Sequence, residues 1–259
     1  MLKYKLIITT LPFVAVVIGL ALIRDFVFRI HGILEFSEVA PILSAVALII
    51  GFMMAGVLTD YKESEKIPGE IATTLETIGD TVQMVIALSK DADTSSVENQ
   101  YARLVATVED WFMGRTSVEH CYAVLDDFRQ VFTIMHQAAG VNYAIRSLAE
   151  LHNLRRLITR VDVISRTSFI PAVYALLNLL VITTISLLLI INYKTIMAEY
   201  FLITLLSLIY IYLLRLIGDV DNPFEYSIGE NKTGSTEVDP FPLQSFRRRF
   251  EAKNKKISA

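Results

Sequence analysis

Four long stretches without a charged side chain most constrain the fold of this 259-residue chain. They run over Leu6 to Ile23, Val39 to Leu58, Phe169 to Ile191 and Tyr200 to Leu214. A hydrocarbon core of about 30 Å requires roughly 20 apolar residues of helix, and the first three stretches meet this length. The fourth is shorter, and Arg215 after it can snorkel to the interface, so we interpret it as a span as well. With 53% hydrophobic residues, the chain is too apolar for an ordinary soluble domain. We therefore expect a multi-pass protein that has the lipid bilayer as a partner.

The four stretches predict two hairpins with a domain inserted between them. Residues 24–38 and 192–199 form short loops within the hairpins, whereas the longer segment 59–168 separates the two hairpins. The predicted parts are a first transmembrane hairpin (1–58), a cytoplasmic helical domain (59–168), a second transmembrane hairpin (169–217) and a C-terminal strap with a basic tail (218–259).

The distribution of basic residues predicts the orientation. Only Arg24, Arg29 and Lys194 lie in the two short loops. The termini and the inserted segment carry many more near the spans, and positive charge near the spans marks the cytoplasmic side. These residues are Lys3, Lys5, Lys62, Lys66, Arg155, Arg156, Arg160, Arg166 and Arg215. We expect both termini and the inserted domain in the cytoplasm.

The inserted segment has the apolar period of helices. After Pro68, apolar residues recur at steps of three and four, which draws one continuous stripe along a helix; they are Ile71, Leu75, Ile78, Val82 and Val85. Ser95 with Glu98, and Thr116 with Glu119, have the capping-box spacing that opens further helices. We therefore predict an all-α fold.

The C-terminal part is expected to differ from the rest. Residues 218–243 are polar with Gly and Pro, which favours an extended strap that rests on the cytoplasmic domain. Residues 246–259 carry many basic side chains, so two alternatives stay open for them. The tail contacts anionic lipid, or it is free and solvated.

Signatures of catalysis and of nucleic-acid binding are missing from the sequence. A net charge of −3 provides no general field for holding nucleic acid. No G-x-S-x-G elbow, Walker A loop or H-E-x-x-H helix is present. Cys121 follows His120, but neighbours on a helix point about 100° apart, so core packing is the better interpretation of Cys121 than a thiolate dyad. We expect no enzyme activity, no cofactor and no metal site.

The second apolar stretch carries two parallel patterns. Ala47, Gly51 and Ala55 recur every four residues and would allow another helix to approach closely. Ser44, Leu48 and Phe52 form an adjacent stripe of mixed size. The patterns fit an oligomer interface beside a pore lining, but spacing alone favours ordinary helix packing.

Two sets of motifs resemble bestrophins. Along the second stretch and just after it, these are Ile42-Leu43-Ser44, Gly51-Phe52, Thr59 and Glu65-Lys66-Ile67-Pro68, in the order of the bestrophin pore helix. After the fourth stretch, Asn222-Pro223-Phe224 and Asp239-Pro240-Phe241-Pro242-Leu243 are similar to the Asn-Pro-Phe and Leu-Pro-Leu elements of that family, particularly in bacteria.

This resemblance implies a homopentamer around an axial pore that conducts ions passively. Ser44, Leu48 and Phe52 fall where the family places three neck residues, and the permeant ion is chloride or sodium. Ser44 is smaller and more polar than the family's usual apolar residue, which implies a wider or wetter upper neck. A bacterial relative of this kind would lie in the inner membrane.

Two questions stay open at this level. The calcium-binding acidic run of animal bestrophins is not repeated after Glu225, so a solvated acidic strap is favoured over a calcium site. The alternative to a channel is a membrane-anchored helical scaffold or signalling adaptor, whose cytoplasmic domain recruits a partner.

Overall fold

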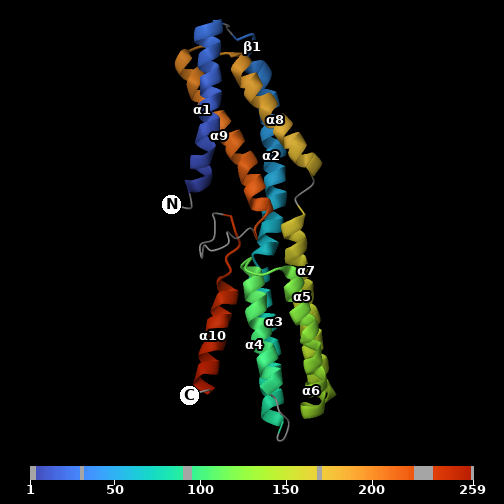
Figure 1. Cartoon of the computed structure of the whole chain (residues 1–259). Coiled ribbons are helices and arrows are strands. Elements are labelled where there is room, and N and C mark those ends of the chain that lie inside the picture. Colours follow the sequence, from blue (N-terminus) through green and yellow to red (C-terminus); the bar gives the residue numbers. More distant parts are fainter. Residues whose placement is uncertain (1–3, 30–31, 90–94, 168–170, 225–235, 258–259) are drawn as a thin grey trace. The chain divides into compact units, whose positions relative to one another are not determined.

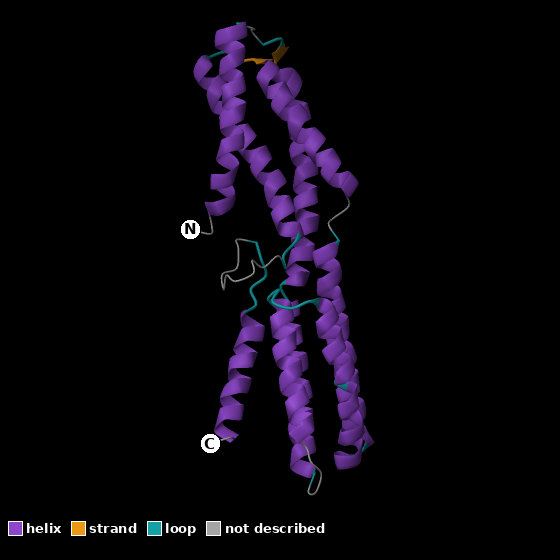
Figure 2. Cartoon of the chain, in the orientation of Figure 1, coloured by secondary structure: helices purple, strands orange, loops and turns teal. Residues whose placement is uncertain are grey.

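The computed structural model describes residues 4–29, 32–89, 95–167, 171–224 and 236–257, and most of these are helical (Figure 2). The chain divides into two compact units. The transmembrane unit comprises Met1–Lys62, Ser168–Pro223 and Gly234–Thr236, and the helical unit comprises Glu63–Thr167, Phe224–Thr233 and Glu237–Ala259.

The transmembrane unit is built from four long helices. These are α1 (Lys5–Ile23, extended by the π-helix η2, Arg24–Phe28), α2 (Phe36–Ser64), α8 (Pro171–Ile190) and α9 (Ile196–Asp221). Each lies in one of four helical segments that are long and apolar enough to cross a membrane. The predictions of four spans and of an all-α fold are therefore confirmed, and the chain is a multi-pass membrane protein. Helix α9 packs along both α1 and α8 (Figure 1).

The two short hairpin loops are joined by backbone contacts. Strand β1 (Leu34–Glu35) pairs in parallel with β2 (Ile191–Asn192). The backbone N–H of Ile33 also donates to the Ile190 carbonyl at 2.9 Å. Gly32 lies so close to β2 that an added Cβ would stand 2.3 Å from backbone atoms of Ile191 and Asn192. Only glycine fits there.

The helical unit is organised around α3 (Ile67–Leu88). The other helices of this unit in the described part are α4 (Ser95–Phe112), α5 (Val118–Asp127), α6 (Arg129–Ala139), α7 (Val141–Arg166) and α10 (Phe241–Ile257). Helix α3 packs against α4, α6, α7 and α10. Its apolar stripe is buried as the helical spacing predicts, and it consists of Ile71, Leu75, Ile78, Val82 and Val85.

Proline, glycine and serine set several helix boundaries. Helix α2 ends at Ser64 because the ring of Pro68 would clash with the carbonyl four residues before it. Gly140, at φ +98°, separates α6 from α7. The cap of α5 is Ser117 rather than the expected Thr116, since the Ser117 Oγ accepts the N–H of His120 at 3.2 Å.

The C-terminal segment differs from the expected extended strap. Helix α9 continues to Asp221, because Ile217 and Val220 are buried in the transmembrane unit. Residues 236–240 are non-helical, and α10 then begins at Phe241, whose N–H donates to the Asp239 carboxylate at 2.9 Å. Residues 225–235, which include Glu225, lie outside the described part.

The basic tail is not a free chain where the structure describes it. Residues 246–253 belong to α10, which packs on α3 and α4 through the buried side chains of Leu243 and Phe246. Phe250 adds an edge-to-face contact with Tyr101, at 5.3 Å between ring centroids. The sequence signal for this helix was the spacing of Leu243, Phe246 and Phe250, which puts three apolar side chains on one helical face.

Candidate functional site

Helix α2 has two opposite faces. One face packs into the core of the transmembrane unit through Val39, Leu43, Val46, Ile50 and Val57, which are 0–6% exposed. At 3.6 residues per turn, the direction opposite this stripe points through positions 48 and 52. A single chain thus leaves one side of its second membrane helix uncovered.

The three predicted neck residues lie on this uncovered side. Leu48 is 60% exposed and Phe52 is 69% exposed, and Ser44 precedes Leu48 by one helical turn on the same side. The Ser44 hydroxyl donates to the Ala40 carbonyl of its own helix at 2.9 Å. The Ser44 hydroxyl therefore needs no hydrogen-bond partner from another helix. The uncovered side of α2 carries no charged side chain at these three positions.

The small residues Ala47, Gly51 and Ala55 are also exposed, on the flank of the same face. A Cβ built on Gly51 would meet no heavy atom within 4 Å in the described chain. Within the described part of the chain, this stripe of small side chains therefore packs against no other helix.

A tyrosine holds α2 at the level of these residues. Tyr210 of α9 is buried, and its hydroxyl donates to the carbonyl of Leu43 at 2.8 Å. In an apolar environment such a hydrogen bond fixes the position of one helix against another. The sequence analysis did not single out Tyr210; a hydrogen-bonding side chain inside an apolar span was the available signal.

Arg215 is a basic side chain well inside the last membrane helix. Its guanidinium donates to the Thr9 carbonyl of α1 at 2.5 Å and lies over the Phe13 ring, 5.2 Å from the centroid. These contacts use the charge of Arg215 to join α9 to α1. They place no charge on the exposed face of α2.

The residues of the C-terminal motif have local structural roles. The Asn222 Oδ1 is buried without a hydrogen-bond partner in the described chain, whereas Phe224 is buried against Phe112, with ring centroids 5.8 Å apart. Asp239 caps α10, and Pro240 and Leu243 are buried beneath its first turn. Asn222 belongs to the transmembrane unit and the other residues of this paragraph to the helical unit.

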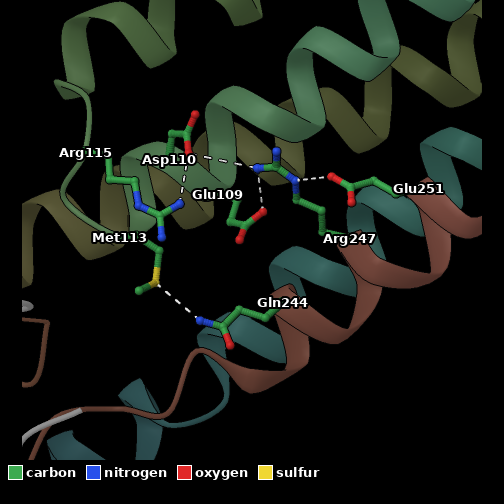
Figure 3. Close-up of polar contacts among 7 residues, drawn as sticks. All are labelled: Glu109, Asp110, Met113, Arg115, Gln244, Arg247 and Glu251. Atoms are coloured by element: carbon green, nitrogen blue, oxygen red, sulfur yellow. Dashed lines mark hydrogen bonds and ion pairs between the residues drawn. The ribbon is translucent and has the colours of Figure 1, made fainter. Parts of the chain in front are cut away.

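Polar contacts attach α10 to α4, as Figure 3 shows. The Arg247 guanidinium contacts the carboxylates of Glu109 at 2.7 Å and of Glu251 at 2.9 Å. Burial lowers the pKa of Arg247, but hydrogen bonds to Glu251 and Glu109 outweigh it, so the pKa lies above its ordinary value. Gln244 adds a contact from its Nε2 to the Met113 Sδ at 3.8 Å.

The described part of the chain contains no cluster of side chains that could bind a metal ion. No three His, Cys, Asp or Glu side chains within it are placed to hold a metal ion. Burial raises the pKa of the Cys121 thiol to about 12, so the thiol is neutral at physiological pH. This agrees with the packing role expected for Cys121.

The chain matches known proteins in its fold but not in its sequence. No family model matches the sequence, and no curated protein matches it. A crystal structure of a bacterial bestrophin homologue from Klebsiella pneumoniae aligns with a TM-score of 0.71 and 12% identity, over 93% of this chain and 96% of that chain. The chain has the bestrophin fold.

Further structures agree with this assignment of the fold. A mutant of the Klebsiella pneumoniae bestrophin homologue aligns with a TM-score of 0.68 and 11% identity, over 95% of this chain and 96% of that one. A structure described as a membrane protein gives 0.71 and 12%, over 94% and 97%. The bestrophin likeness read from the motifs is thus confirmed for the fold.

Proposed function

We propose that the chain is one subunit of a passive ion channel of the bestrophin type, in which copies of α2 line an axial pore. The observation that carries this proposal is the uncovered face of α2, which bears Ser44, Leu48 and Phe52 opposite a fully buried stripe. A membrane helix that packs on one side only has its other side available for lipid, for a neighbouring subunit or for a pore.

The pore requires several copies of the chain. Ala47, Gly51 and Ala55 flank the proposed lining and allow neighbouring α2 helices to approach closely. Five copies, as the family resemblance implies, would form one ring. Native mass spectrometry of the detergent-solubilised protein measures this number directly.

Leu48 and Phe52 would form an apolar neck that gates by dewetting, with Ser44 making one end wider and wetter. No charged side chain lies on this stripe, which favours passive conduction of monovalent ions over ion-coupled transport. Chloride and sodium are the two candidates. The distribution of basic residues supports an orientation with both termini and the helical unit in the cytoplasm. The fold likeness to a bacterial bestrophin homologue supports a bacterial inner membrane.

Planar-bilayer recording of the purified chain under a salt gradient tests the proposal. Discrete currents that reverse at the equilibrium potential of one ion would support it and identify that ion. Phe52→Ala widens the proposed neck and is expected to raise the single-channel conductance. Phe201→Ala is the matched control, because Phe201 is a comparably exposed phenylalanine, at 63%, but lies on α9.

Two results would count against the channel. Equal conductances for Phe52→Ala and the wild type would remove Phe52 from the neck. Silent bilayers with a folded oligomer, at all calcium concentrations and pH values tried, would favour the membrane-anchored scaffold.

A further inference from the structure

A cavity of about 500 Å³ lies within the transmembrane unit, at the end where the two hairpin loops meet. It is lined by η2 and the residue after it on one side, and by β2 and the first turn of α9 on the other. Its volume falls in the range of about 300–1,000 Å³ that is typical of small-molecule sites. Nothing in the proposed conduction path uses this cavity.

The floor of the cavity is a closed set of polar contacts. Arg24 forms ion pairs with Asp25 and Glu199, and also donates to the Leu189 carbonyl. Tyr200 donates to the second Asp25 oxygen at 2.9 Å. The Arg24 and Glu199 side chains are only 14% and 13% exposed. This floor satisfies its own charges and needs no ligand.

Two further cations line the same cavity without a partner. Arg29 and Lys194 are both exposed, and neither side chain forms a hydrogen bond or an ion pair within the described part of the chain. The first turn of α9, capped by the Thr195 side chain, also faces this region and adds the positive end of a helix dipole. The lining therefore attracts an anion.

Apolar surface lies beside these cations. Phe26 is 75% exposed and Ile196 is 74% exposed, and Tyr193 is partly buried. All three line the cavity. Inorganic anions would leave this surface without a contact, whereas an organic anion would cover it and gain the free energy of apolar burial.

We propose that this cavity binds a small organic carboxylate, held by Arg29 and Lys194 through its carboxylate group and by Phe26, Tyr193 and Ile196 through its apolar body. Arginine and lysine form charge-assisted hydrogen bonds with carboxylates, and arginine does so with two parallel bonds. The site joins the loops of both hairpins, and none of the three proposed neck residues lines it.

Isothermal titration calorimetry of the full-length protein in detergent, in a chloride buffer, tests this site. The probes are benzoate, which has a carboxylate and a ring, acetate, which lacks the ring, and inorganic phosphate. We expect saturable binding of benzoate that is stronger than the binding of acetate or phosphate.

Three variants locate the binding. Arg29→Gln and Lys194→Gln are each expected to weaken benzoate binding on the order of tenfold or more, since each removes a cation that makes charge-assisted hydrogen bonds with the carboxylate. Arg248→Gln is the matched control, because Arg248 is an exposed cation of α10 outside the cavity. Lys194 is exposed on a loop, so its variant tests the site even where Arg29→Gln disturbs folding.

The outcomes are distinct from those of the channel proposal, because the readout is binding and not current. No saturable heat with benzoate up to the millimolar range would overturn the site. Equal affinities for benzoate in the wild type and in Lys194→Gln would also overturn it. Binding of phosphate as tight as that of benzoate would reject the organic carboxylate as its ligand.

Discussion

Replacing Gly79 by alanine should destabilise the helical unit, although alanine is the better helix former. A Cβ at this position of α3 would stand 2.4 Å from the Tyr101 hydroxyl oxygen and 2.9 Å from its Cζ. Tyr101 is 4% exposed, and its hydroxyl donates to the Leu75 carbonyl at 2.7 Å. Burial, with the charges of Asp80 and Glu76, raises the pKa of Tyr101, so the hydroxyl stays a donor. The ring cannot move away without breaking that hydrogen bond.

The magnitude follows from three contributions. Overpacking in a core costs about 1–3 kcal/mol, and a lost buried hydrogen bond adds about 1–3 kcal/mol. The helix propensity of alanine returns about 1 kcal/mol. We expect a net loss of about 3 kcal/mol in the free energy of unfolding, which is roughly 6–12 °C in Tm at about 2–4 °C per kcal/mol for a chain of this size class.

Thermal unfolding followed by the fluorescence of Trp111 measures this loss. Trp111 is the only tryptophan and lies on α4, the helix that carries Tyr101. Gly69→Ala is the control on the same helix, because a Cβ there meets no heavy atom within 4 Å. Equal Tm values for Gly79→Ala and Gly69→Ala would refute the reasoning. Adding Tyr101→Phe to Gly79→Ala should recover part of the loss, since it removes the nearest clashing atom.

Three further predictions concern other parts of the chain. Arg247→Gln leaves the buried carboxylate of Glu109 on α4 without its ion pair, so we expect it to lower Tm. The decrease should exceed that of Arg249→Gln, because the ion pair of Arg249 is exposed and worth at most about 1 kcal/mol. Equal decreases in Tm would contradict the role of Arg247 in attaching α10 to α4. Cys121 should react slowly with thiol reagents at pH 8 in the folded protein, because its pKa is raised to about 12. Because the buried form of Cys121 is the neutral thiol, its contribution to the free energy of unfolding is present below the ordinary pKa of 9.0 and is lost as pH rises toward 12. Rapid labelling of Cys121 in the folded protein would exclude its burial. Gly32→Ala should lower Tm strongly, since the clash at 2.3 Å is with backbone, whereas Gly19→Ala on α1 has no atom within 4 Å and should not.

The sequence was sufficient for the membrane spans and for the core of α3, because both depend on local composition and period. Uncharged length alone locates four membrane helices, and a step of three and four residues marks a buried stripe such as that from Ile71 to Val85. The fold likeness was also visible in short motifs around Gly51-Phe52 and Asn222-Pro223-Phe224.

Features that depend on distant partners were not accessible in the same way. The contact of Tyr210 with the Leu43 carbonyl joins residues that are 167 positions apart. The cavity beside Arg29 and Lys194 forms only when two hairpin loops pair through β1 and β2. Helix α10 was missed for a different reason, because its many charges, with Pro240 before it and Pro242 in its first turn, hid a short apolar period.

The separation of the two faces of α2 also affects how this protein can be altered. Side chains at positions 44, 48 and 52 project away from the subunit core, so changing them removes few internal contacts and should cost little folding free energy. Changes at Leu43, Val46 or Ile50 act on that core directly. One helix thus keeps the residues available for adaptation apart from those that maintain the fold of the chain, and side chains on the outward face can be redesigned while the scaffold stays the same.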